Sequence, residues 1–289
     1  MRILRTLALL AVTLALTLTL ALAPSIVVAQ PASVQKRLLP LAERTMGDAV
    51  WRLPAAKDDR FVVLTIDDAP SSYTNAILDI LAEEKVKATF FVHTEQINDD
   101  TRQAAMKRLV QDGHELAHHM PRDQSAADYD RDSFEELFRV DFYNAHTALS
   151  AYGKAAKPYF RPPQGWYKSA LMDTTLTRFG YGKPLADLGS ERRYIMASFI
   201  PWDAAAGKTD TDDPAHNRKM SDRYTDGLLK NLFPGAVVIF HDGEEDGRAR
   251  RAEATLGALE RFIREAKAKG YDLVPLSEGI ERSGATGLR

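Results

Sequence analysis

The segment Gly113–Asp123, which reads GHELAHHMPRD, decides which fold this chain can adopt. Residues 114–118 spell H-E-x-x-H, which on a helix is a zinc-binding signature of metalloproteases. Gly113 ends a preceding helical pattern. Pro121 cannot lie inside a helix, because its ring would collide with the carbonyl group of Ala117. The segment is therefore too short for the helix that the zinc motif requires, and we expect a strand.

A strand at this place divides the neighbouring histidines between two faces. Side chains alternate with a period of two, so His114 and His118 face one side and His119 faces the other. The two histidines of H-E-x-x-H are then expected to pack inside the protein rather than bind zinc. A zinc protease with Glu115 as its base is the least favoured hypothesis for this chain.

The rest of the chain alternates between apolar segments and segments with helical periodicity. Segments typical of buried strands are FVVLTID (61–67), ATFFVHT (88–94), GAVVIFH (235–241) and YDLVPLS (271–277). Helices are predicted over residues 75–85, 101–112, 133–153 and 250–269. Wholly apolar strands covered by one-sided helices are typical of an α/β protein with a parallel sheet. About seven such repeats over about 220 residues favour a closed or nearly closed (β/α) barrel over an open sheet.

The beginning of the chain differs in composition from the remainder. Two arginines precede a long run of Leu, Ala and Thr, and small residues stand at the expected cleavage site. We predict a secretory signal peptide at residues 1–29, a helical or irregular lead-in at residues 30–60, and the barrel domain at residues 61–282. The protein is then exported to the periplasm or the medium, or anchored to a membrane if the leader is not cleaved.

Composition excludes several classes of function. The chain contains no cysteine, so neither a disulfide nor a lipid-modified cysteine is available. Without the leader it has 36 basic and 40 acidic residues, a net charge of −4. No basic cluster with interleaved aromatic residues occurs, so a nucleic-acid partner is not expected. Beyond the leader no segment is predicted to span a membrane.

Residues 203–220 are predicted to form a polar, acidic loop.

Carboxylates and imidazoles gather at the predicted carboxyl ends of strands and extended segments. These ends carry the active site in β/α barrels. The four segments, in chain order, are TIDDAP (65–70), HHMPRD (118–123), RPPQGW (161–166) and FHDG (240–243). We therefore expect a catalytic site assembled from residues that are far apart in the chain.

These segments resemble the motifs of the NodB-homology polysaccharide deacetylases, carbohydrate esterase family 4. The resemblance rests on TIDDAP, GHELAHHMPRD, RPPQGW and PGAVVIFHDG in this order, and it covers roughly residues 60–280. It implies a distorted, NodB-like (β/α) barrel of about seven strands. It also implies a metal-dependent hydrolase that removes N-acetyl groups from an extracytoplasmic polysaccharide or oligosaccharide. An N-acetylated glycan is then the expected partner, whereas the oligomeric state is not predicted.

The same resemblance implies roles for three side chains and one turn in the reaction. Asp67 would be the general base, and His241 would be the general acid. Arg161 would hold the carboxylate of Asp67. The turn that contains Gln164 would offer an N–H group to the developing oxyanion. Apart from the resemblance, Trp166 and Trp202 could stack on sugar rings, with aromatic packing in the barrel rim as the equal alternative.

The resemblance also implies that Asp68, His119 and Asp123 bind one divalent metal ion. Asp123 stands where the family usually has a second histidine. A short helical turn opened by Pro121 would place Asp123 on the same face as His119. Zinc is the first expectation for two carboxylates and one imidazole, with manganese, cobalt or nickel as alternatives.

Two points stay open at the level of the sequence. Asp187 and Asp203 are equal candidates for the carboxylate that would support His241. The family usually has glycine at the position of Ala69 and an aromatic residue at the position of Gln164. These departures leave a catalytically impaired barrel that binds glycans as the alternative function.

Overall fold

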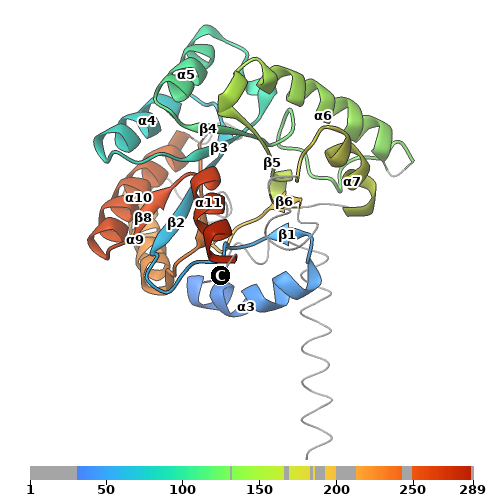
Figure 1. Ribbon diagram of the computed structural model, residues 1–289. Coiled ribbons are helices and arrows are strands. Elements are labelled where there is room, and N and C mark those ends of the chain that lie inside the picture. Colours follow the sequence, from blue (N-terminus) through green and yellow to red (C-terminus); the bar gives the residue numbers. More distant parts are fainter. Residues whose placement is uncertain are drawn as a thin grey trace, which may run out of the picture.

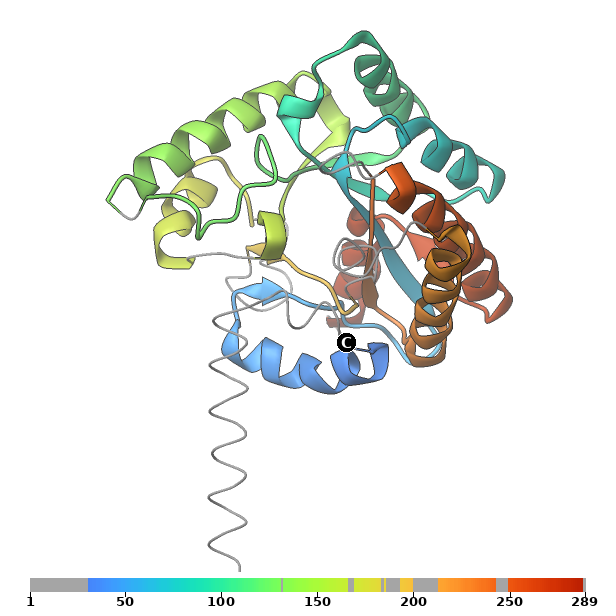
Figure 2. The same ribbon diagram turned by 180° about the vertical axis from the view of Figure 1, so that it is seen from behind.

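The computed structural model describes residues 31–130, 132–165, 169–182, 185, 193–199, 213–242 and 249–287. In this part of the chain, parallel strands form a curled sheet with helices packed around its outer side (Figure 1). Figure 2 shows the same arrangement from behind. The expected leader at residues 1–29 lies outside the described residues. Among the described helices, none combines the length and the hydrophobicity that crossing a membrane requires.

Strands and helices alternate along the chain in the order that the sequence predicts. The strands are β1 (Ala49–Val50), β2 (Phe61–Ala69), β3 (Thr89–Val92), β4 (Glu115–His118), β5 (Ala156–Phe160), β6 (Tyr194–Ile195), β7 (Ala236–His241) and β8 (Asp272–Val274). The helices are α3 (Ala32–Thr45), α4 (Thr74–Glu83), α5 (Asp100–Gln111), α6 (Phe134–Ser150), α7 (Ser169–Arg178), α9 (Pro214–Asn231), α10 (Ala249–Ala268) and α11 (Leu276–Gly287). The predicted strands and helices are confirmed, with their ends displaced by a few residues, whereas β6, α7, α9 and α11 were not predicted.

The sheet curls until its two ends nearly meet. Its strand order is β1-β6-β5-β4-β3-β2-β7, and β8 pairs with β2 beside this path. Beyond β6, Phe199 forms a parallel bridge with Val238 of β7. Beyond β1, Arg52 forms an antiparallel bridge with Ala236 of the same strand. These bridges join the ends of the path, so the predicted distorted (β/α) barrel is confirmed.

The lead-in at residues 30–60 contributes more to the sheet than its sequence predicts. It forms the helix α3, and the two residues of β1 then pair with β6 in parallel. A strand of two residues has no alternation that a sequence pattern could reveal. Its existence depends on the neighbouring strand, which lies far away in the chain.

The expectation of a loop over residues 203–220 is wrong from residue 214 onward. Pro214 begins α9, and the carboxylate of Asp213 caps this helix by accepting the N–H of Ala215 at 2.9 Å. Asp at the cap followed by Pro at the first helical position is a helix-start signal. The high content of charged residues hid this signal. Residues 203–212 lie outside the described part of the chain.

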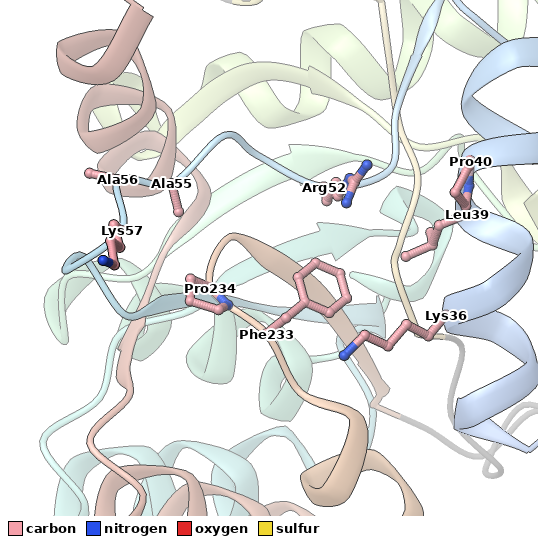
Figure 3. A pocket seen from close by; sticks show the side chains of 9 residues that line it. All are labelled: Lys36, Leu39, Pro40, Arg52, Ala55, Ala56, Lys57, Phe233 and Pro234. Carbon is pink, nitrogen blue, oxygen red and sulfur yellow. The ribbon is translucent and has the colours of Figure 1, made fainter.

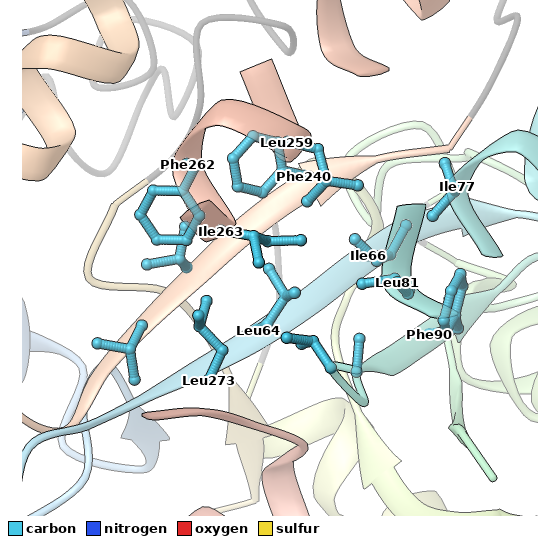
Figure 4. Close-up of a cluster of buried hydrophobic side chains, with 14 of the residues drawn as sticks. Leu64, Ile66, Ile77, Leu81, Phe90, Phe240, Leu259, Phe262, Ile263 and Leu273 are labelled. Carbon is cyan, nitrogen blue, oxygen red and sulfur yellow. The ribbon is translucent and has the colours of Figure 1, made fainter. Parts of the chain in front are cut away.

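Alternate side chains of each strand enter two different hydrophobic layers. In β2, Leu64 and Ile66 pack outward against Leu81 of α4 and Phe262 of α10 (Figure 4). Val63 points the other way, into a second cluster that fills the barrel. The residues of this inner cluster that lie on β2, β3, β4, β5 and β7 are Phe61, Val63, Phe91, Ala117, Tyr159, Val237 and Ile239.

The inner alternation continues past the apolar residues to the carboxyl ends of the strands. A step of two residues from an inner core residue reaches a polar side chain at each end. The polar residues reached in this way are Thr65 and Asp67 after Val63, His93 after Phe91, His119 after Ala117, Arg161 after Tyr159, and His241 after Ile239. The parallel strands therefore place these six polar side chains at one mouth of the barrel.

The opposite end of the barrel is closed by α11. Gly279 of this helix lies so close to β2 that a Cβ atom there would come within 2.6 Å of Val63 Cγ2. A cavity of about 420 Å³ opens at this end, between Leu39 of α3 and the Phe233–Pro234 segment that precedes β7 (Figure 3). None of the predicted site residues lines this cavity.

The strand conformation of residues 115–118 removes the zinc-protease hypothesis. Glu115 is on the inner side of the strand, where its carboxylate accepts the hydroxyl of Thr89 at 2.7 Å. His114 lies on the outer side, and its Nδ1 accepts the N–H of Ala88 at 3.1 Å. His118 is also on the outer side, and its ring is stacked on that of Phe142 with 4.0 Å between the ring centroids. The two histidines are packed, as the alternation predicts.

The pKa of His114 makes this packing testable. Burial lowers it to about 4 from the ordinary value of 6.5. Because the folded state favours the neutral ring, its stabilisation is fully present above pH 6.5 and is lost as the pH falls toward 4. His114→Asn keeps an acceptor for the N–H of Ala88 but cannot titrate in this range. As the pH falls from 6.5 to 4, we expect the free energy of unfolding to decrease by about 2–3 kcal/mol less in this variant than in the parent protein. Urea unfolding at several pH values measures the difference, and identical pH profiles would contradict the buried neutral histidine.

Candidate active site

A β-bulge near the end of β2 directs two adjacent carboxylates into one site. The register of β2 against β3 shifts between Asp67 and Ala69, which leaves Asp68 as the extra residue. Asp68 has a φ of 68°, a left-handed value that is uncommon for a residue other than glycine. In a regular strand the two carboxylates would point to opposite faces. Here Asp67 Oδ2 and Asp68 Oδ1 lie 3.8 and 3.5 Å from His119 Nε2.

Backbone hydrogen bonds continue the sheet for one residue beyond three of the strands. The N–H groups of His93, His119 and Arg161 donate to carbonyl groups of the neighbouring strand at 2.9, 3.2 and 3.1 Å. Each of these residues comes directly after its strand, β3, β4 or β5. The ladder therefore fixes three functional side chains side by side on adjacent strands.

Arg161 is a buried cation that holds Asp67 in the barrel mouth. Its Nη1 donates to the carboxylate of Asp67 and, at 3.0 Å, to the hydroxyl of Thr65. Its other nitrogens donate to the carbonyl groups of Ile195 and Met196 at 3.0 and 3.1 Å. Burial lowers the pKa of Arg161, but the facing carboxylate of Asp67 opposes this shift. The guanidinium thus joins β2 to β6 and supplies the counter-charge for the predicted base.

Three side chains at the mouth could hold a metal ion. Asp68, His93 and His119 each offer one ligand atom, and these atoms lie within 4.8 Å of one another. Asp68 Oδ1 lies 3.1 Å from His93 Nε2 and 3.5 Å from His119 Nε2. The other ring nitrogen of His119 lies 2.7 Å from the carbonyl oxygen of Arg161, and that of His93 lies 3.5 Å from the carbonyl oxygen of Met120. Such contacts orient an imidazole with its Nε2 toward a metal.

The charges around these three side chains favour a cation. Burial raises the pKa of Asp68, but hydrogen bonds with His119 and His93 outweigh burial and hold it well below its ordinary value. Burial lowers the pKa of His119, but the hydrogen bond with Asp68 and the charge of Asp67 raise it overall. One carboxylate and two imidazoles form a donor set that fits zinc, and manganese, cobalt and nickel are also compatible with it.

The expected triad of Asp68, His119 and Asp123 does not come together in this structure. Residues 121–123 form a bend instead of the expected helical turn, and Met120 has a φ of 65°. Pro121 disfavours the helical region for Met120, so the shared helical face of His119 and Asp123 does not form. Asp123 instead accepts a hydrogen bond from Gln164 Nε2 at 3.3 Å.

His93 was not among the residues predicted from the sequence. The signal that could have identified it is its place two residues after Phe91, which lies on the inner face of β3. The predicted strand over residues 88–94 contains both residues, so its alternation directs His93 to the barrel mouth.

His241 is the last residue of β7 and lies beside Asp67 in the strand register. It is followed by Asp242, whose fully buried carboxylate accepts the hydroxyls of Ser71 and Thr74, both at 2.6 Å. The N–H of Asp242 donates to the carbonyl of Asp67 at 2.7 Å. Burial raises the pKa of Asp242 to about 6. This residue, which the sequence analysis did not select, fixes the end of β7 to the start of α4.

The predicted substrate contacts lie at the rim or outside the described residues. Gln164 is exposed and has a φ of 56° within the short turn Pro163–Gly165. Strained backbone of this kind is concentrated at functional sites. Trp166 is outside the described part of the chain, as are Asp187 and Asp203, the candidates for supporting His241. The substrate roles of Gln164 and Trp166 therefore stay predictions.

Comparison with known proteins shows which family part of this chain resembles. Residues 55–182 match the family model described as polysaccharide deacetylase. Over these residues the chain is similar to the polysaccharide deacetylases. The match spans the bulge of β2, both candidate histidine ligands and Arg161, so it confirms the resemblance that the motifs carry.

Individual relatives extend the likeness over most of the chain. A peptidoglycan-N-acetylglucosamine deacetylase of Bacillus cereus is 25% identical over 80% of this chain and 92% of its own length. A chitooligosaccharide deacetylase of Rhizobium leguminosarum bv. trifolii is 26% identical over 78% of this chain and 94% of its own length. The crystal structure of the Bc1960 peptidoglycan N-acetylglucosamine deacetylase shares the fold, with a TM-score of 0.62, 22% identity, and coverage of 85% of this chain and 98% of that one.

The buried position of Arg161 predicts a large cost for its removal. Arg161→Ala leaves the carboxylate of Asp67 buried without its counter-charge, so we expect the free energy of unfolding to fall by about 3–5 kcal/mol. Arg52→Ala is the matched control, because it removes an arginine whose side chain is 45% exposed and pairs with Glu43. This control should cost less than about 1 kcal/mol. Chemical denaturation measures both variants, and equal small losses would contradict a buried ion pair.

Proposed function

We propose that this protein is a metal-dependent hydrolase that removes N-acetyl groups from a polysaccharide or oligosaccharide outside the cytoplasm. The observation that carries the proposal is the meeting of Asp67, Asp68 and His119 at one barrel mouth, beside Arg161 and His241. The two relatives compared above are named as deacetylases of peptidoglycan N-acetylglucosamine and of chitooligosaccharide, which supports an N-acetylated glycan as substrate. The leader predicted at residues 1–29 supports export.

Hydrolysis of an acetamide requires a polarised carbonyl group, an activated water molecule and an acid for the leaving amine. A divalent cation held by Asp68 and His119, zinc in the first place, would polarise the acetyl carbonyl and lower the pKa of a water molecule. Asp67 accepts the proton that the water molecule loses as its oxygen attacks the carbonyl carbon. His241 donates a proton to the sugar nitrogen as the carbon–nitrogen bond breaks. The products are acetate and the free amino sugar.

The surroundings of Asp67 suit the role of a general base. Arg161 holds one carboxylate oxygen, Oδ1, so the other oxygen faces His119 and the barrel mouth. The guanidinium has no acceptor capacity and stays protonated, so it cannot compete for the proton that Asp67 takes. The base is therefore fixed in orientation before the substrate binds.

The rim residues suit a role in positioning the glycan. Gln164 and Asp123 form a hydrogen-bonded pair beside the turn Pro163–Gly165, and both side chains reach solvent. An N–H group of this turn would stabilise the oxyanion that forms when water attacks. Trp166 would add stacking to a sugar ring.

Acetate release from metal-stripped and reloaded protein tests the proposed function. We expect the protein to release acetate from N-acetylglucosamine oligomers or from peptidoglycan when loaded with zinc, manganese, cobalt or nickel. Stripping the metal with a chelator should abolish the activity, because the carbonyl group is then not polarised. Binding of the glycans without acetate release under any metal would contradict the proposal and favour the impaired, glycan-binding barrel.

The base assignment predicts a selective defect. Asp67→Asn should lower kcat by about 10²- to 10⁴-fold, because the amide cannot accept the proton from water. Metal content should be unchanged, since the carboxylate of Asp68 is retained. Asp79→Asn is the matched control, because Asp79 is an exposed residue of α4 paired with Arg108. Full activity of Asp67→Asn in the acetate assay would show that another group is the base.

A further inference from the structure

We infer that His93, rather than Asp123, is the third protein ligand of the metal ion. One ligand then lies on β2, and the other two directly follow β3 and β4. The inference rests on the proposed function only for the presence of a metal at this mouth. It assigns a residue that no motif of the resemblance includes. It also leaves Asp123 as a rim residue.

The distances favour His93 over Asp123. The Nε2 atom of His93 lies 3.1 Å from Asp68 Oδ1, and the ligand atoms of Asp68, His93 and His119 are all within 4.8 Å of one another. Atoms bound at about 2.0–2.3 Å to one ion must lie within about 4.6 Å of each other, so this grouping needs little movement. Asp123 belongs to no such group among the described residues.

The surroundings of His93 orient its ring toward the other two donors. Its side chain is fully buried, and its ring is stacked on that of His119 with 4.6 Å between centroids. Its N–H donates to the carbonyl of Ala69, directly after the bulge that directs Asp68 inward. The ring and the carboxylate are thus tied to the same irregular point of the sheet. The carbonyl of Met120 faces the Nδ1 atom, which leaves Nε2 for a metal.

The surroundings of Asp123 direct its carboxylate elsewhere. It is partly exposed, follows the bend at residues 121–123, and is engaged with Gln164. It lies outside the group that Asp68 and His119 form with His93. The alternative role for His93 is to stabilise the carboxylate of Asp68 without binding the metal. That role and the ligand role differ in whether the ring itself contacts the metal.

The absence of cysteine from the chain allows direct observation of the contact. Because the protein has no thiol of its own, a cysteine introduced at one position is the sole source of a thiolate-to-metal charge-transfer band. We expect cobalt-loaded His93→Cys to gain such a band in the near ultraviolet. Cobalt-loaded Asp123→Cys, the matched control, should show none. A band in Asp123→Cys, or none in either variant, would overturn the inference.

Zinc affinity provides a second readout that does not depend on spectroscopy. Competition titration with a chromophoric chelator should show zinc binding about 100-fold weaker in His93→Ala and changed by less than about threefold in Asp123→Ala. Circular dichroism of the metal-free variants checks that both are folded. The reverse order of affinities would contradict the assignment. Neither readout uses activity, so metal binding through His93 without acetate release would reject the proposed function alone.

Discussion

The buried guanidinium of Arg161 is the contact on which the rest of the site depends. It binds the carboxylate of Asp67 on β2 and carbonyl groups at the end of β6. The backbone N–H of the same arginine donates to the carbonyl of His118 at the end of β4. A buried carboxylate without such a partner would be costly, so the cation allows two carboxylates to stand side by side in the barrel mouth. The second of them, Asp68, is then opposed by two histidines.

Two features of the sheet convert this arrangement into a site. The alternation of parallel strands brings His93, His119 and Arg161 to the mouth, because each follows an inner core residue by two positions. The bulge at Asp68 breaks the same alternation once, so that its carboxylate joins that of Asp67. A regular ladder would have buried the second carboxylate under the outer helices.

The sequence was sufficient to predict the barrel, because its strands are apolar and its helices are one-sided. It also located Asp67, Arg161 and His241, since each stands at a predicted strand end. It could not select His93, because a histidine beside a strand can equally be packed and hydrogen-bonded, as His114 is. Local backbone geometry was the other limit. A left-handed residue before Pro121 replaced the expected helical turn with a bend, and sequence patterns do not reveal such a conformation.

The central claim is that side chains from three neighbouring strands meet around one cation. Crystals of the zinc-loaded protein, measured on both sides of the zinc absorption edge, test it most directly. The account predicts a single strong anomalous peak, which marks a zinc ion bound at about 2 Å by Asp68, His93 and His119. An anomalous peak placed elsewhere, or bonded to Asp123 in place of His93, would contradict it.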